Sequence, residues 1–234
     1  MDKHYQPKFQ EEYSAKIPAL TLLTSLGWAF LSPKQIMDYR GYKQDEGVLR
    51  PGLREELSKR SFMAGGKTCQ LSEKALDNLI SQVCSPALNE GLLKANERMY
   101  NHLLYGIAVT EFVDGKKVNP TIALIDWEHP ENNQFHFTEE FTVLRSGGVE
   151  TRRPDIVCFV NGIPLAVIEA KSPAGHGKKG PTIDEGISQS IRNQFNDEIP
   201  QLFAYSQILL SINGHDGRYG TCHTPMKFWA AWRE

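Results

Sequence analysis

The sequence predicts an α/β protein, with a mixed central β-sheet flanked by helices and a helical N-terminal portion. Up to residue 105 apolar residues recur at helical spacing, whereas from residue 106 onward the period is two and β-branched and aromatic residues predominate. Two later runs, 155–160 and 165–169, are almost uniformly apolar, which is typical of strands buried on both faces. With 234 residues, the chain is long enough to bury one large core.

The N-terminal portion is predicted to form helices. The apolar residues of 19–26 recur with a helical period, which ends at Gly27, and glycine is common at helix C-termini. Further helices are expected to begin at Arg50-Pro51 and at Ser72, and a longer one covers about 87–104. Four helices are therefore expected before the first convincing strand.

The C-terminal portion reads mainly as strands. Strands are expected at 107–112, at 121–126, around 135–143, and at 155–160, 165–169 and 207–212, with a short edge strand at 218–222. A glycine-rich loop at 175–181 precedes a helix at 183–195. We expect a mainly helical portion, 1–105, that packs on a core formed by 106–234, the two together making one structural domain.

Composition narrows the class of protein. The net charge of -2 and pI near 6.4 are not those of a typical nucleic-acid-binding domain, so such a role depends on local charge. Arg152 and Arg153 before the apolar runs, and Lys178 and Lys179 in the glycine-rich loop, are candidate DNA contacts, although a solvated face is the ordinary interpretation. The four cysteines lack metal-binding spacing, and neither a signal segment nor a membrane-length apolar run is evident. A cytoplasmic chain without a membrane partner is expected.

One apparent nucleotide motif is set aside. Gly65-Gly66-Lys67-Thr68 lacks the leading glycine of a phosphate-binding P-loop, because Ser61 occupies that position. We predict a surface loop here and no ATP site in the chain.

The candidate catalytic and metal-binding residues lie in two short segments, Pro154-Asp155 and Glu169-Ala170-Lys171. Alternation along a strand places Glu169 and Lys171 on one face. Asp155, Glu169 and the carbonyl of Ala170 offer hard oxygen ligands for Mg²⁺, and Lys171 could contact the attacking water or the scissile phosphate in phosphodiester hydrolysis. The alternative is an ordinary strand-opening acid with a same-face surface pair. An acid that continues an apolar strand weakens that alternative, because unpaired burial of its charge is unfavourable.

The hairpin between the two apolar runs makes this hypothesis testable. A regular two-residue turn at Asn161-Gly162 would pair Val160 with Ile163 and send the two carboxylates to opposite faces. Convergence requires a shift of one residue, through a three-residue loop with Gly162 in a left-handed conformation or through a bulge near Asp155. We predict such an irregularity.

Pro154-Asp155 followed by Glu169-Ala170-Lys171 across an apolar hairpin resembles the PD-(D/E)xK nuclease superfamily. Other segments resemble the N-terminal nuclease domain of the restriction (motor) subunit of type I restriction-modification enzymes. They are 26–28, 48–53, 172–173, 197–205 and 228–234. The resemblance implies a restriction-endonuclease-like fold, catalytic Asp155, Glu169 and Lys171, Mg²⁺ as cofactor and double-stranded DNA as substrate. It also implies modification and specificity subunits as partners, and ATP use by motor domains outside this chain, which would be a fragment of a longer subunit.

The resemblance also points to auxiliary residues. Many superfamily members carry a Q-x-x-x-Y motif on the helix after the lysine, but here Asn193 stands where Tyr is expected after Gln189. Both amides share a helix face and are candidates for positioning DNA. The literal match, Gln201 to Tyr205, lies downstream and has capping or packing as an equal alternative. Glu12 is a candidate fourth acid.

Two other functions compete with an endonuclease domain that cuts after translocation by a motor. One is a stand-alone repair or junction nuclease, which would be expected to be more basic. The other is a catalytically silent DNA-binding or assembly module, against which the intact Asp155, Glu169 and Lys171 argue.

Overall fold

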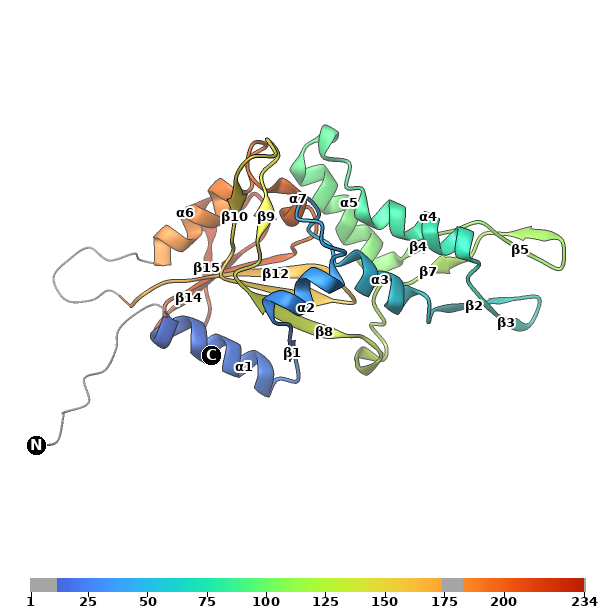
Figure 1. The fold of residues 1–234 in the computed structure, drawn as a ribbon, viewed down its shortest axis with the longest axis horizontal. Helices are drawn as coiled ribbons and strands as arrows, with labels where there is room; N and C mark the ends of the chain where they lie inside the picture. The colour runs from blue at the N-terminus through green and yellow to red at the C-terminus, as the bar shows by residue number, and fades with distance from the viewer. Residues whose placement is uncertain (1–11, 174–182, 234) are drawn as a thin grey trace, which may run out of the picture.

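A computed structural model describes residues 12–173 and 183–233, and its centre is a seven-stranded sheet in the order β1-β8-β11-β12-β13-β14-β15 (Figure 1). The pairs β1–β8 and β12–β13 are parallel, and the other neighbours are antiparallel. The predicted fold class is thus confirmed. The strands are β1 (Ala29–Phe30), β8 (Phe135–Glu139), β11 (Ile156–Val160), β12 (Ile163–Ala170), β13 (Ile208–Ile212), β14 (Gly217–Gly220) and β15 (Ala230–Ala231).

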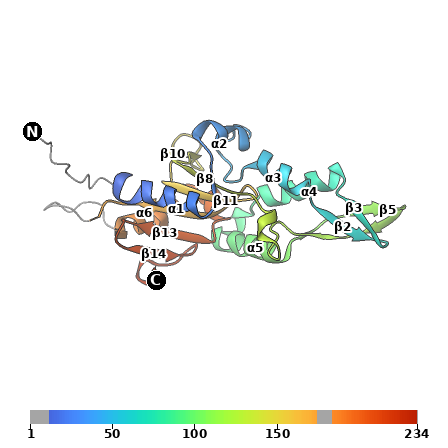
Figure 2. The ribbon, with the colours of Figure 1, turned by 90° about the horizontal axis from the view of Figure 1, so that it is seen from below.

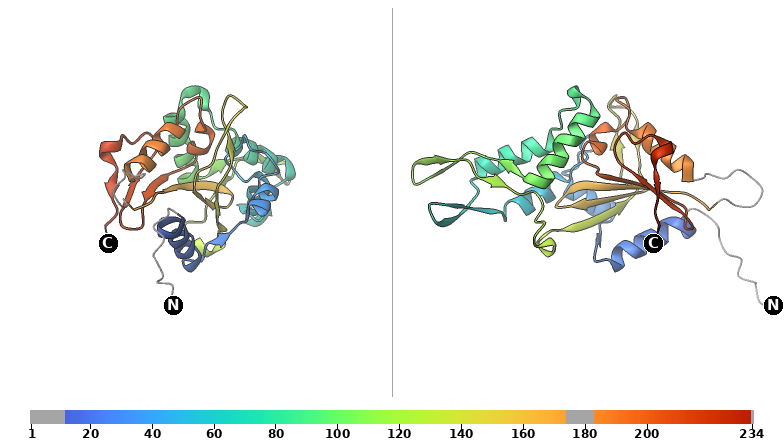
Figure 3. Two further views of the ribbon diagram at one scale, coloured as in Figure 1. Left: turned by 60° about the vertical axis from the view of Figure 1, so that its left-hand side comes forward. Right: turned by 180° about the vertical axis from the view of Figure 1, so that it is seen from behind.

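The two apolar runs form β11 and β12, the third and fourth strands of this sheet, and every residue of β11 is buried. Burial on both faces follows from helices on both sides. On one face α1 (Ile17–Ser25), which follows the π-helical turn η1 (Glu12–Lys16), packs through Leu20 and Leu23 against side chains of β8, β11 and β12. On the other face α6 (Ile183–Asn193) crosses β12 and β13. Figure 3 shows the sheet between these two helices.

The N-terminal portion contains the expected helices, α1, α3 (Arg50–Leu57), α4 (Glu73–Cys84) and α5 (Leu92–Tyr105). Gly27 follows α1 with a φ of 89°, and the Ser72 side chain caps α4 by accepting from the Ala75 N–H. The portion also contains α2 (Pro33–Tyr39), the 3-10 turn η2 (Leu88–Glu90) and three short strands, so the expectation that no strand precedes the fourth helix is wrong. A two-residue strand such as β1 is too short to show a period.

Two hairpins project from the end of the molecule that lies farthest from α1 and α6 (Figures 1 and 2). The first joins β2 (Ser61–Ala64) to β3 (Lys67–Gln70), with Gly65 and Gly66 as its turn, so the predicted surface loop is half turn and half strand. The second joins β5 (Glu111–Val113) to β6 (Lys116–Val118), and a further small sheet pairs β4 (Ile107–Ala108) with β7 (Thr121–Ile122). The strands expected at 107–112 and 121–126 therefore lie outside the central sheet.

The remaining elements connect these layers. They are η3 (Pro130–Asn132), β9 (Val143–Leu144), β10 (Thr151–Arg152), α7 (Pro200–Phe203) and η4 (Met226–Phe228). The strand expected at the sheet edge, β14, is covered by β15, which forms the edge instead. A two-residue edge strand leaves little backbone open to pairing with another chain.

One hydrophobic cluster joins the two portions. Leu53 of α3 and Leu79 of α4 belong to the same buried cluster as Val157 and Phe159 of β11. All four cysteines are free thiols. Burial raises the pKa of Cys84 to about 11 and that of Cys158 and Cys222 to about 12, so these thiols are poor nucleophiles at neutral pH. Among the described helices, none has the length and apolar character needed to cross a bilayer.

Candidate active site

The β11–β12 hairpin turns through Asn161 and Gly162, whose φ angles are 51° and 82°. These are the angles of a regular two-residue type I′ turn. The register shifts between Cys158 and Phe159, because β12 contributes one extra residue, Leu165, at that step. The predicted irregularity is confirmed, but its position was wrong: the turn is regular and the bulge lies within β12.

The bulge brings the two acids to one face. Ile156 pairs with Ile168, so Asp155, immediately before β11, lies opposite Glu169. Both residues are buried, with exposed fractions of 8% for Asp155 and 0% for Glu169. Asp155 Oδ2 accepts a hydrogen bond from the Ala170 N–H at 2.8 Å, which ties the start of one strand to the end of the other.

Lys171 completes this group. Its residue is 6% exposed, and its Nζ lies 3.4 Å from Asp155 Oδ2 and 3.7 Å from Glu169 Oε2. The Lys171 N–H donates to the Ile212 carbonyl of β13 at 2.7 Å, so the residue continues the strand pairing beyond β12. A buried ammonium between two carboxylates gives strong electrostatic interactions, because little water screens them.

Of the two auxiliary amides, one reaches this group. Gln189 of α6 donates from Nε2 to Glu169 Oε2 at 2.7 Å. Asn193, one turn beyond Gln189, is also buried, but its side-chain Oδ1 accepts from Arg192 Nη2 at 3.5 Å. The helix face shared by the two amides therefore brings only Gln189 to the carboxylates.

The downstream Q-x-x-x-Y match has packing roles. Gln201 Nε2 donates to the Leu144 carbonyl at 2.6 Å, and the Tyr205 hydroxyl donates to the Val83 carbonyl at 2.9 Å. Tyr205 is 1% exposed, and burial raises its pKa well above the ordinary value. Both side chains stabilise the contact between the C-terminal segment and neighbouring elements.

Sequence reasoning missed a second charged group beside the strand end. Lys16 of η1 lies 3.0 Å from Glu139 and 2.7 Å from Glu140, at the end of β8. The Glu140 N–H donates to the Asp155 carbonyl at 3.0 Å, so this ion pair is attached to the backbone of the candidate catalytic acid. The adjacent acids at the end of a predicted strand were a readable signal, but their distant lysine partner was not.

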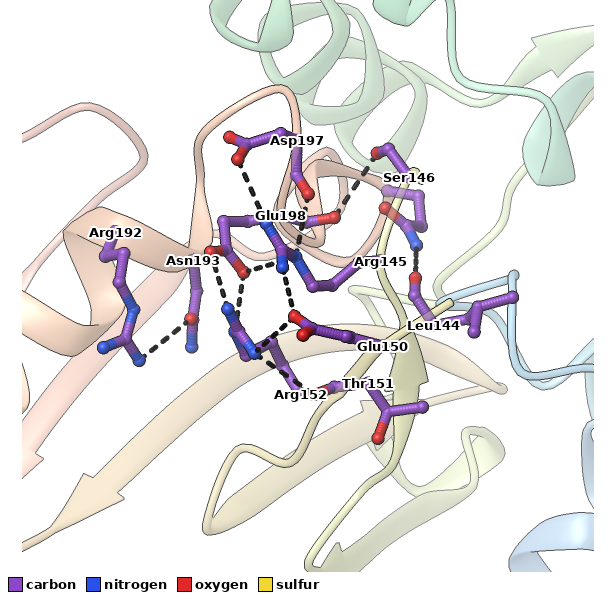
Figure 4. A network of polar contacts seen from close by, with 11 residues as sticks. Leu144, Arg145, Ser146, Glu150, Thr151, Arg152, Arg192, Asn193, Asp197 and Glu198 are labelled. Carbon is purple, nitrogen blue, oxygen red and sulfur yellow. Dashed lines mark hydrogen bonds and ion pairs between the residues drawn. The ribbon is translucent and has the colours of Figure 1, made fainter. Parts of the chain in front are cut away.

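Arg152 is partly exposed and forms an ion pair within the protein. Its Nη2 donates to Glu198 Oε1 at 2.8 Å and its Nε lies 2.6 Å from Glu198 Oε2. Arg145 Nε lies 3.3 Å from the same carboxylate, and Figure 4 shows the two guanidinium groups converging on it. Arg153 is more exposed and lies 3.7 Å from Glu140. Of the two candidate DNA-contacting arginines, Arg153 is thus the more accessible.

Three predicted residues fall outside what the structure describes. They are Lys178 and Lys179 in the segment 174–182, and Glu12, whose side chain is not described although its backbone opens η1. Among the described parts of the chain, no three His, Cys, Asp or Glu side chains gather as a metal-binding group. The oxygen donors at the strand end are the carboxylates of Asp155 and Glu169, with Ala170 between Glu169 and Lys171. Hard oxygen donors of this kind fit Mg²⁺.

A mixed sheet that brings an Asp, a Glu and a Lys together on one face agrees with the resemblance to the PD-(D/E)xK superfamily. The family model described as "Type I restriction enzyme R protein N terminus" matches residues 8–228. The chain therefore belongs to this family.

Named relatives agree with this assignment. The endonuclease subunit of the type I restriction enzyme HindI from Haemophilus influenzae is 30% identical over 225 residues, which cover 93% of this chain and 20% of that subunit. The putative MjaIXP endonuclease subunit from Methanocaldococcus jannaschii is 27% identical over 228 residues, or 92% of this chain and 20% of the relative. The chain thus spans about a fifth of the length of these relatives.

Proposed function

We propose that this chain is the Mg²⁺-dependent endonuclease domain of a type I restriction enzyme subunit, which hydrolyses phosphodiester bonds of double-stranded DNA. The family membership and the relatives named as endonuclease subunits support this proposal. The observation that carries it is the bulge in β12, which brings Asp155 and Glu169 to one face beside Lys171.

The residues of the site have distinct roles. Asp155, Glu169 and the Ala170 carbonyl would hold Mg²⁺, which when bound supplies an activated water and neutralises charge on the phosphate. Lys171 donates hydrogen bonds from Nζ, either to the attacking water or to the phosphate oxygens, where they stabilise developing negative charge. Gln189 fixes the orientation of the Glu169 carboxylate. Burial keeps bulk water away and strengthens each of these interactions.

Cleavage depends on parts of the subunit beyond this chain. The curated relatives are about five times as long as the matched region, and the resemblance implies motor domains in the remainder. We propose that ATP-driven translocation by those domains precedes cleavage, and that modification and specificity subunits select the DNA.

The experiment is a DNA cleavage assay on the full subunit assembled with its partner subunits, with and without Mg²⁺. Asp155→Ala and Lys171→Ala are expected to abolish cleavage. Glu97→Ala and Lys94→Ala, which change exposed residues of α5, are the matched controls and are expected to cleave normally. Cleavage that survives both site substitutions would contradict the assignment.

Two further outcomes separate the alternatives. Efficient cleavage by the isolated chain would favour a stand-alone nuclease. A complete assembly that binds DNA and yet does not cut it with Mg²⁺ present would favour a silent DNA-binding or assembly module.

A further inference from the structure

Gly186, in the first turns of α6, lies at an unusually close contact between that helix and the sheet. With Ile187, Ser190 and Asn193 it forms the buried stripe of α6. Its backbone does not have a positive φ, so conformation does not require glycine here. Glycine within a helix costs about 1 kcal/mol relative to alanine. A reason for glycine must therefore come from packing.

The packing reason is visible in the distances. A Cβ at Gly186 would lie 2.2 Å from Ser211 Oγ, 3.2 Å from Ser211 Cβ and 3.3 Å from Lys171 Cγ. The helix backbone thus rests directly on the aliphatic stem of the candidate catalytic lysine. No larger residue fits without moving the helix, the serine or the lysine.

Ser211 holds the other side of this contact. It is fully buried in β13, and its Oγ donates to the carbonyl of Ile183, the first residue of α6, at 2.7 Å. In the parallel β12–β13 pairing, Ser211 is the partner of Glu169. The start of α6 is therefore tied to the sheet at the strand position next to the buried carboxylate.

We propose that Gly186 and Ser211 are positioning residues, which set the height of α6 over the sheet and thereby place both Lys171 and Gln189 against the two carboxylates. A lysine side chain has about 2 kcal/mol of rotamer entropy, and close packing of its stem limits the positions of Nζ. The same helix carries Gln189 three residues later, which reaches Glu169 at 2.7 Å. Lifting the helix would displace the ammonium and the amide together.

This inference rests on the proposed nuclease function, and its test uses the complete enzyme with Mg²⁺. Gly186→Ala is expected to lower the cleavage rate at saturating DNA by about 10-fold to 100-fold, since displacements near 1 Å can have effects of that size. The DNA concentration for half-maximal rate should change little. Ser211→Ala alone should lower the rate less, because it removes the bond to Ile183 without adding bulk.

The decisive variant is the double substitution, Gly186→Ala with Ser211→Ala. It removes the oxygen that the new methyl group meets, so it should cleave faster than Gly186→Ala alone. The melting temperature of each variant separates the two explanations, a positioning role and a general loss of stability, because a positioning role predicts a lowered rate even at temperatures where Gly186→Ala is fully folded. Gly52→Ala is the matched control, because Gly52 is also in a helix and a Cβ there would lie 2.8 Å from the Tyr39 ring. Its helix, α3, packs against the turn of the β11–β12 hairpin, at the end opposite to the candidate site. It should leave the cleavage rate unchanged even where it lowers the melting temperature.

The outcomes separate this inference from the proposed function. If Asp155→Ala cuts DNA as the wild type does, the proposed function fails. If Asp155→Ala is inactive while Gly186→Ala cuts at the wild-type rate, or the double variant cuts no faster than Gly186→Ala, only the positioning role fails. If Gly186→Ala does not fold, the double variant and Ser211→Ala decide the question. Wild-type cleavage rates in both variants would overturn the proposal. A lowered rate in Ser211→Ala, at an unchanged DNA concentration for half-maximal rate, would support it.

Discussion

The two ends of the β11–β12 hairpin bury polar groups in opposite ways. At the turn, Asn161 is fully buried, and its amide donates to the Leu124 carbonyl and to Asn133 Oδ1, both at 2.8 Å, while its Oδ1 accepts from the Gln134 N–H at 2.8 Å. At the open end the buried groups are the acidic side chains of Asp155 and Glu169 and the basic side chain of Lys171, at ion-pair distances. One end buries neutral groups bonded mainly to backbone, and the other buries charge.

This difference separates stability from chemistry. A neutral amide with its hydrogen bonds satisfied contributes to stability, whereas buried ion pairs contribute little, because desolvation offsets much of their attraction. Gly162 reinforces the turn end, since a Cβ there would lie 2.8 Å from the Leu53 N and 2.9 Å from the Leu49 carbonyl of the packed helix start. The hairpin is thus anchored at its turn, and the acidic and basic side chains of the candidate site lie at its open end.

The largest expected effect comes from neutralising the open end. Glu169→Gln keeps the shape of the side chain and removes its charge. We expect cleavage to fall by about 10³-fold, the upper range for loss of an electrostatic group in an active site. The free energy of unfolding should stay within about 1 kcal/mol of the wild type or rise, because Asp155 still lies beside Lys171 and the substitution leaves no buried charge without a partner. Cleavage assays with parallel urea unfolding check both parts, and a large loss of stability would show that the carboxylate is structural.

The next effect should appear at the turn end, in stability. Asn161→Ala leaves buried groups without their partners and places alanine at a φ of 51°, so we expect a loss of about 3 kcal/mol in urea unfolding. Asp114→Ala is the matched control: Asp114-Gly115 forms the same kind of turn, with a φ of 50°, at the tip of a projecting hairpin. It should lose only about 1 kcal/mol, the conformational part of the effect. Equal losses in the two variants would contradict the anchoring role of the buried amide.

The two ends also differ in how far the sequence predicted them. The central strands were readable from local residues, because alternation acts over a few positions, and Asn161-Gly162 marked the place of the turn, but the regular two-residue form of the turn was not predicted. The convergence of Asp155 and Glu169 was inferred from chemistry, while the position of the bulge was missed. Pro164 was the readable clue, since proline in a central strand usually marks a bulge.

Contacts between distant segments left no such trace. The approach of Gly186 to Lys171 depends on the height of a helix over a sheet, and the pairing of Lys16 with Glu139 and Glu140 joins residues more than a hundred positions apart. Neither has a period or a turn signature. The ion pair between Arg152 and Glu198 illustrates the same limit, because β11, β12 and α6 separate these two residues in the sequence.

That arginine cluster offers a third test, since it buries charge close to the open end without being part of the site. Glu198 is 5% exposed and lies against both Arg145 and Arg152. Glu198→Gln should lower the free energy of unfolding by about 1 to 2 kcal/mol, less than for a fully buried pair because the arginines are partly exposed. Glu73→Gln, in an exposed pair with Arg54, should change it by less than about 1 kcal/mol. Cleavage should stay normal in both, and a loss in Glu198→Gln alone would connect the cluster to the chemistry.

The smallest effect concerns Lys16, which tests whether the open end has a stabilising ion pair of its own. Burial opposes protonation of this lysine, but its hydrogen bonds to Glu140 and Glu139 outweigh burial and raise its pKa above the ordinary 10.5. A raised pKa means that the folded state binds this proton more tightly than the unfolded state does. The stabilisation is therefore complete below about pH 10.5 and is lost as the pH rises through the higher value for the folded protein.

Lys16→Met should be less stable than the wild type by under about 1 kcal/mol at neutral pH, because the group is partly screened. Urea unfolding from about pH 8 to about pH 12 covers the pKa of Lys16 in both states. The stability difference between wild type and Lys16→Met should narrow at the alkaline end of this range. A difference that does not depend on pH would assign the contribution of Lys16 to packing, and would leave the open end of the hairpin without electrostatic support from η1.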